Sequence, residues 1–164
     1  MGPYDSVPVT RTYTQHIEAP PARVFPLICP VREVEWLEGW GDAVEIVHSR
    51  SGLAEEGCVF RTRAEGQPET VWMITRHEAD RGLVEFVRVT PGLVATRLVV
   101  RIEAGADGGS TVRVTYTFTP LGAAGAELVR EKHSEAAFRR SLEWWERSMN
   151  HWLRTGETLR AEAA

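Results

Sequence analysis

Residues 18–40 read EAPPARVFPLICPVREVEWLEGW, and this stretch gives the strongest indication of the fold. Pro21 and Pro30 each suit the first position of a helix, where the missing N–H has no intrahelical partner to lose. The stretch therefore predicts the end of a strand followed by two short helices. Trp36 and Trp40 are four residues apart, so they share one side if the second helix extends that far.

On both sides of this stretch, up to about residue 119, apolar and polar residues alternate along most segments of the chain. Such alternation is typical of strands with one buried and one wet face, as in an antiparallel sheet covered on one side. Residues 105–109, GADGG, are a strong turn signal between the last two strands. The seven predicted strands are Val9–Ile17, Ala43–His48, Gly57–Ala64, Glu69–His77, Leu83–Thr90, Val94–Ala104 and Ser110–Thr119.

Residues 124–153 contain no proline, and their only glycine, Gly125, falls in the first turn. We predict one helix here, about 45 Å long at 1.5 Å per residue. Its apolar residues follow helical spacing over most of its length. They are Leu128, Phe138, Leu142, Trp145, Met149 and Trp152.

One strand, two short helices, six strands and a long helix predict an α+β helix-grip fold, in which a seven-stranded curved antiparallel sheet is crossed by the C-terminal helix. Such a fold encloses a cavity. We expect one domain over residues 1–164, with an ordered core from about residue 9 to 153.

Composition excludes several classes of function. The net charge of −4 argues against nucleic-acid binding, and no apolar run approaches the roughly 20 residues of a membrane span. Cys29 and Cys58 lie outside any CxxC pair, so we expect two buried, reduced thiols in a cytoplasmic protein, with a disulfide or a catalytic thiol as alternatives. The five histidines are scattered and no nucleotide-binding motif occurs, so we predict neither a metal nor a cofactor.

The segment IEAPPARVF at residues 17–25, the strand count, and a terminal helix carrying Trp144 and Trp145 together resemble the SRPBCC superfamily. That superfamily includes START lipid-transfer domains, the birch-pollen allergen and polyketide cyclases. Residues 29–40 are similar to a bacterial subgroup of it. The superfamily has no shared catalytic motif, so the resemblance implies no catalytic residue. It implies a hydrophobic cavity between sheet and helix for lipids, sterols, polyketides or hormones.

Inward positions of the predicted strands and helix are candidates to line that cavity, although core packing explains each one alone. Trp36 and Trp40 gate the cavity mouth, stack a flat ligand, or form a hydrophobic plug between the short helices and the long one, and we favour the plug. The other candidates are Trp72 or Met73, Phe86, Leu98, Val100, Val114, Tyr116, Phe118, Phe138, Leu142 and Trp145.

Two polar side chains, Glu33 and Tyr116, are candidates for chemistry. Glu33 and Glu35 point to different sides of the short helix, and Glu33, three residues before Trp36, is expected to face the cavity. A carboxylate in an apolar pocket can act as a general base with a raised pKa, or the same side chain can pair with Arg32 at the surface. Tyr116 has a hydroxyl that needs a partner when buried, either a ligand or the backbone.

The orientation of Arg88 depends on strand register. If Val84 and Phe86 face inward, so does Arg88, and it then needs an anionic partner: Glu33, Glu35 or a ligand carboxylate. The opposite register leaves Arg88 in solvent. Because unpaired arginines are rarely buried, we favour the solvent-exposed orientation.

Three functions remain open. The first is a module that binds or transports a small hydrophobic or amphipathic ligand (a lipid, polyketide or aromatic) without stable membrane insertion. The second is a cofactor-free enzyme of the cyclase or dehydratase type, which requires at least two titratable groups with perturbed pKa values in one pocket. The third is a protein-interaction module that uses exposed tryptophans. A homodimer is left open by the sequence.

Overall fold

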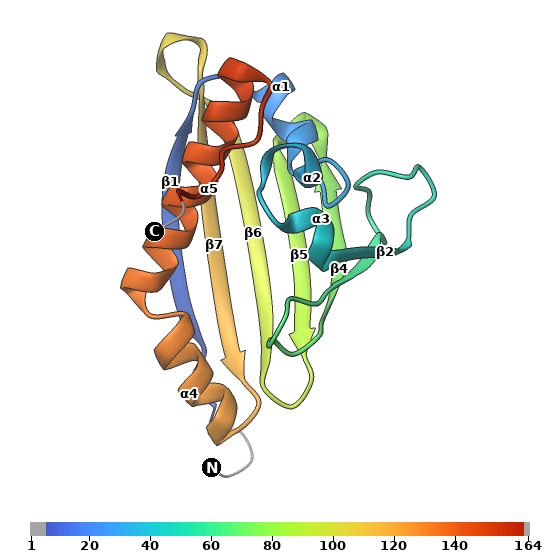
Figure 1. Ribbon diagram of the computed structural model, residues 1–164, viewed down its shortest axis with the longest axis vertical. Coiled ribbons are helices and arrows are strands. Elements are labelled where there is room, and N and C mark those ends of the chain that lie inside the picture. Colours follow the sequence, from blue (N-terminus) through green and yellow to red (C-terminus); the bar gives the residue numbers. More distant parts are fainter. Residues whose placement is uncertain (1–5, 163–164) are drawn as a thin grey trace.

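The computed structural model of the protein describes residues 6–162. Seven strands form one antiparallel sheet in the order β1-β7-β6-β5-β4-β3-β2, so the first two strands of the chain form its two edges. Figure 1 shows the helices gathered on one side of this curved sheet. The strands are β1 (Val9–Ile17), β2 (Val44–His48), β3 (Val59–Thr62), β4 (Thr70–Glu78), β5 (Leu83–Thr90), β6 (Val94–Ala104) and β7 (Ser110–Pro120). The predicted α+β helix-grip fold is therefore confirmed.

The inward faces of the long strands follow the predicted alternation. On β7, Val112, Val114 and Phe118 are buried whereas Arg113 is exposed. Cross-strand pairing with β6 places Val100 opposite Val114 and continues the apolar face. The strand pairs thus form one continuous apolar surface beneath the helices, because side chains alternate between the two faces of a sheet.

The favoured orientation of Arg88 was wrong. Val84 and Phe86 on β5 are buried, and the guanidinium of Arg88 lies inward over two aromatic rings. On β4, Trp72 is the buried residue and Met73 is exposed. Side chains alternate between the two faces along β5, so Arg88 shares the inward face of Val84 and Phe86. This alternation outweighed the general rarity of buried arginines.

The short helical segments are α1 (Pro21–Val24), the 3-10 helix η1 (Phe25–Leu27), α2 (Glu33–Trp36) and α3 (Trp40–Ala43). Pro21 occupies the first position of α1, as predicted. Pro30 does not begin a helix, because it lies in a turn and two further turn residues separate it from α2. Trp36 and Trp40 belong to different helices, since Gly39 between them adopts a left-handed φ of 79° that ends helical geometry.

The predicted C-terminal helix consists of two helices, α4 (Ala123–Lys132) and α5 (Glu135–Thr155). Ser134 causes the break: its backbone is extended, and its hydroxyl accepts a hydrogen bond from the Ala137 N–H to cap α5. Figure 1 shows α4 and α5 following β1 and β7 along the sheet with a bend between them. The bend lets the two helices pack against different parts of the core.

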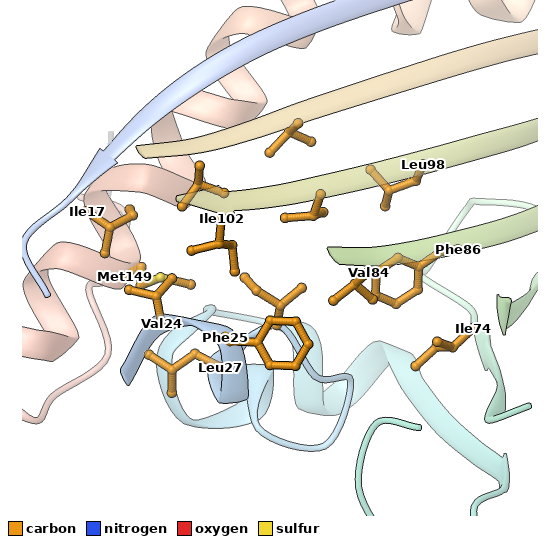
Figure 2. Close-up of a cluster of buried hydrophobic side chains, with 14 of the residues drawn as sticks. Ile17, Val24, Phe25, Leu27, Ile74, Val84, Phe86, Leu98, Ile102 and Met149 are labelled. Atoms are coloured by element: carbon orange, nitrogen blue, oxygen red, sulfur yellow. The ribbon is translucent and has the colours of Figure 1, made fainter. Parts of the chain in front are cut away.

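The main core lies between the sheet, the short helices and α5. Figure 2 shows side chains of α1 and η1, including Val24, Phe25 and Leu27, meeting the inward residues of β5 and β6. A second, smaller cluster lies under α4, where Val129 packs with Val94 and Phe118.

Gly125 sets the position of α4. A Cβ at this buried glycine would overlap the Leu93 carbonyl oxygen, which is backbone and cannot move aside. We expect Gly125→Ala to lower the free energy of unfolding by about 1–3 kcal/mol in urea denaturation. Gly122→Ala is the matched control, since a Cβ there meets nothing within 4 Å and its φ of 166° suits any residue. Equal stability of the two variants would contradict this account.

Candidate ligand-binding site

A cavity of about 90 Å³ lies between the sheet, the short helices and α5; we call it the inner cavity. Beside it is a wider depression of about 430 Å³, here called the mouth, which shares Trp40, Trp72 and Tyr116 with the inner cavity. The residues that line the inner cavity are Ile28, Glu33, Leu37, Trp40, Phe60, Trp72, Phe86, Leu98, Tyr116 and Trp145.

Four aromatic rings form one wall of the inner cavity. Phe60 on β3 stacks on Trp72 of β4, with ring centroids 5.2 Å apart and an interplanar angle of 18°. Phe86 on β5 meets both rings edge-on, at 6.3 and 6.2 Å. Trp40 of α3 also meets them edge-on, and its indole N–H donates to the Pro30 carbonyl at 2.8 Å. With that donor satisfied inside the protein, Trp40 contributes apolar surface to the wall.

Trp145 of α5 also lines the inner cavity, and Trp36 of α2 packs against it from the core. Their rings stack at 6.0 Å with an interplanar angle of 13°, and Trp36 is fully buried with its N–H donating to the Leu27 carbonyl at 3.1 Å. Trp36 is thus the hydrophobic plug between the short helices and α5, whereas Trp40 lines the cavity. The buried indole N–H of Trp145, by contrast, finds no acceptor among residues 6–162.

Glu33 lies at the first position of α2 and lines the inner cavity, as predicted from its spacing to Trp36. Burial raises the pKa of its carboxyl to about 8, so at neutral pH the carboxyl is mostly protonated. No described residue forms an ion pair or side-chain hydrogen bond with it. Glu35 faces the other way and pairs with Arg32 at 3.0 Å on the surface.

Tyr116 on β7 belongs to both the inner cavity and the mouth. Its ring rests edge-on against Phe138 at 5.2 Å. Burial raises the pKa of its hydroxyl; the charge of Arg88 opposes that rise and the charge of Glu33 adds to it. Within the described chain the hydroxyl has no hydrogen-bond partner, so it is free to bind a ligand.

The mouth contains Arg88, Lys132 and His133. The Arg88 guanidinium carbon lies 4.8 Å from the centroid of the Trp72 ring and 5.2 Å from that of Tyr116. Burial lowers the pKa of Arg88, partly offset by Tyr116. His133 stacks on Phe118 at 4.4 Å, and burial, reinforced by the positive charge of Arg88, lowers its pKa to about 4.

Several predicted lining residues belong to the core instead: Trp36, Val100, Val114, Phe118, Phe138 and Leu142 are absent from both walls. The sequence reasoning did not single out Ile28, Leu37 or Phe60 in the inner cavity, nor Thr62, Lys132 or His133 in the mouth. Phe60 lies on a predicted strand, so its inward alternation was the available signal. For His133 the available signal was Ser134, because serine favours the position just before a helix. A new helix beginning after Ser134 places His133 at the break between two helices.

Other kinds of site find no support in the described part of the chain. Among residues 6–162, no three histidine, cysteine or acidic side chains group in a way that could hold a metal ion. Neither is any helix in this range both long and apolar enough to cross a membrane. Cys29 and Cys58 are both buried and free, so the alternative of a disulfide between them is wrong.

Comparison with known proteins places this geometry in a family context. Residues 8–147 match the protein family described as "Polyketide cyclase / dehydrase and lipid transport". No curated protein sequence gives a significant match.

Solved structures share the fold at low sequence identity. Ara h 8.0201 aligns with a TM-score of 0.66 and 20% identity, over 91% of this chain and 100% of its own. Norcoclaurine synthase from Thalictrum flavum, in complex with dopamine and hydroxybenzaldehyde, aligns with a TM-score of 0.69 and 10% identity, over 94% and 91%. DynU16, from the dynemicin biosynthetic locus, aligns with a TM-score of 0.58 and 15% identity, over 90% of this chain and 48% of its own.

The protonated state of Glu33 predicts a pH-dependent stability. Because folding raises its pKa from 4.5 to about 8, the folded state binds one more proton between these values. The free energy of unfolding contributed by this group therefore falls as pH rises through this window, by at most about 5 kcal/mol. Glu33→Gln removes this loss, so the variant is more stable than the wild type at pH 9 and similar at pH 4, as urea unfolding would measure.

Glu35→Gln is the matched control, because Glu35 pairs with Arg32 at the surface. Its free energy of unfolding is expected to stay within about 1 kcal/mol of the wild-type value at both pH values. If Glu33→Gln showed no greater pH-dependent gain than this control, the carboxyl of Glu33 would not be buried in its neutral form.

Proposed function

The chain belongs to the polyketide cyclase/dehydrase and lipid transport family, and on that premise we propose that it binds a small hydrophobic or amphipathic ligand in the inner cavity and mouth. The observation that carries the proposal is the inner cavity itself. Its walls are mainly aromatic and aliphatic, and its few polar groups, Glu33, Tyr116 and the Trp145 N–H, have no partners within the described chain. Such a combination is typical of small-molecule sites, and because those sites span about 300–1,000 Å³, the ligand would extend from the inner cavity of about 90 Å³ into the mouth of about 430 Å³.

The affinity of this site would come mainly from burial of apolar ligand surface. Each 100 Å² removed from water contributes about 2.5 kcal/mol. Phe86 and Trp40 meet the Trp72 ring edge-on, so this wall of the cavity is aromatic and favours a ligand that carries an aromatic ring. The complex of norcoclaurine synthase with two aromatic molecules supports aromatic ligands as compatible with this fold.

Filling the inner cavity tests the proposal. Leu98 lines the cavity and is 4% exposed, so Leu98→Trp should occupy the ligand's space. We expect titration with N-phenyl-1-naphthylamine to show binding by fluorescence enhancement, and the variant to weaken it about tenfold or more. Circular dichroism and thermal unfolding would establish that the variant is folded.

Leu53→Trp makes the same substitution in the loop between β2 and β3, where Leu53 is 47% exposed. It should bind the probe like the wild type. Unchanged binding in both variants would place the probe outside the inner cavity and count against the proposal.

A second candidate function, a cyclase or dehydratase, is favoured by one observation. Glu33 and Tyr116 line the same cavity and both have raised pKa values, which meets the condition stated for an enzyme. Elimination of water needs a base that takes a proton from carbon and an acid that protonates the departing hydroxyl. A carboxyl with a pKa near 8 exists in both forms at mildly alkaline pH and could supply the two steps in turn.

The molecules that co-purify with the protein distinguish a binder from such an enzyme. Native mass spectrometry followed by denaturing extraction would identify them. A binder should release the same molecule from the wild type and from Glu33→Gln. An enzyme should release from Glu33→Gln a molecule heavier by one water, because the unreacted substrate remains bound, whereas Glu35→Gln should match the wild type.

The third candidate, a protein-interaction module, has less support. This hypothesis requires tryptophans that are exposed at the surface. Trp36, however, is fully buried, and Trp72 is 7% exposed. Trp40 and Trp145 line the inner cavity. A cytoplasmic location stays a prediction from the sequence, and a homodimer is still left open.

A further inference from the structure

The mouth of the cavity has a charge opposite to that of the whole chain. The chain carries a formal net charge of −4. The mouth nevertheless contains Arg88 and Lys132, and among the described residues that line it there is no aspartate or glutamate. An opening that concentrates positive charge on an acidic protein selects for negatively charged molecules by electrostatic attraction.

Arg88 is the innermost of these cations. It projects from β5 across the sheet surface, where its cross-strand neighbours are Trp72 on β4 and Thr96 on β6. The guanidinium lies over the Trp72 and Tyr116 rings, which supply a weak cation–π attraction. These rings accept no strong hydrogen bond from its five N–H donors, so most of the donors remain available.

No acidic side chain of the described chain compensates Arg88. Its predicted partners were Glu33 and Glu35, but Glu35 pairs with Arg32 and Glu33 forms no ion pair. Glu33 is also mostly protonated at neutral pH. A half-buried guanidinium without a carboxylate is costly to maintain unless another anion binds it.

The surroundings of Arg88 also offer hydroxyl donors. Thr62 in the mouth accepts a hydrogen bond from the Trp72 indole at 3.0 Å, so its own hydroxyl proton is free to point elsewhere. Thr70 and Thr90 bond to each other at 2.8 Å across β4 and β5, which leaves one of their two hydroxyl protons uncommitted. The guanidinium and the uncommitted hydroxyls are therefore hydrogen-bond donors that have no acceptor within the described chain.

We propose that Arg88 binds the anionic group of an amphipathic aromatic ligand, such as a carboxylate or sulfonate, while the apolar body of the ligand enters the inner cavity. The inference rests on the proposed function and names its ligand class: a planar molecule with an anionic end. The two ends of the site differ accordingly, since the inner end presents the neutral carboxyl of Glu33 and the mouth presents a fixed positive charge.

Two fluorescent probes with the same aromatic skeleton test the proposal. They are 8-anilinonaphthalene-1-sulfonate, which is anionic, and N-phenyl-1-naphthylamine, which lacks the sulfonate. A charged hydrogen bond contributes about 1.5–3 kcal/mol, so Arg88→Gln should lower the affinity for the anionic probe by roughly tenfold to a hundredfold. The neutral probe should change by less than about twofold, because it gains nothing from the guanidinium. Arg88→Lys, which keeps the charge, should restore part of the anionic probe's affinity.

Arg97→Gln is the matched control for non-specific attraction. Arg97 is exposed on the outer face of β6, next to β5, and pairs with Glu85 at 2.7 Å. Its loss should leave both probes unchanged. Equal weakening of the anionic probe by Arg97→Gln and Arg88→Gln would overturn the proposal, and so would equal weakening of both probes by Arg88→Gln.

Failure of this inference can be separated from failure of the proposed function. If the wild type binds the neutral probe but Arg88→Gln leaves the anionic probe unaffected, the anion site is wrong and the binding function stands. If the wild type binds neither probe, both fail.

His133 provides a second measurement that does not depend on affinity. Its pKa is lowered to about 4 by burial and by the charge of Arg88. The other titratable groups near it are Lys132 on α4, Tyr116 on β7 and Arg11 on β1, whose side chain donates a hydrogen bond to the His133 carbonyl at 3.2 Å. An anion on Arg88 should raise the pKa of His133 in an NMR titration, because it neutralises the nearby positive charge. The neutral probe should leave the pKa of His133 unchanged. If the pKa of His133 were the same with the anionic probe as with the neutral probe, the proposed site would be contradicted.

Discussion

The stacking of Trp36 on Trp145 is the contact on which the site depends. Helix α5 is held on β1 by Gln15, whose side-chain amide donates to the Leu142 carbonyl at 3.0 Å, and by Asn150, which bonds to the backbone of His16. Trp36 then attaches the short helices to α5 through a fully buried ring. Since Glu33 is on the same short helix as Trp36, this one contact also places the carboxyl over the cavity.

Glu33, Arg88 and His133 share an unusual property: each is buried or half-buried without an ion pair or a side-chain hydrogen bond in the described chain. Glu33 responds by holding its proton, His133 by losing its own, and Arg88 by lying over aromatic rings. A core selected for stability alone would fill these positions with apolar residues, because uncompensated polar groups weaken folding. Departures from that rule are expected where a protein keeps groups for a ligand.

Particular residues show how far sequence reasoning reached. The alternation of β6 and β7 correctly placed Leu98 and Tyr116 inward, and the spacing of Glu33 to Trp36 correctly placed its carboxyl. Arg88 was misjudged because the general rarity of unpaired buried arginines was allowed to outweigh the period of its own strand. The break before α5 was missed because the apolar stripe on both sides of Ser134 suggested one helix, although Ser134 itself was a capping residue.

The amino-acid pattern alone was enough to predict the order of the strands, the inward faces of β6 and β7 and the family to which the chain belongs. These follow from periodicity and local backbone preferences, which act between neighbouring residues. Only the tertiary structure decided which inward side chains border a cavity, and which polar groups meet there without a partner. Glu33, Arg88, Tyr116 and Trp145 come from four separate elements, so their environment depends on how those elements pack, and no local pattern specifies the space left between them.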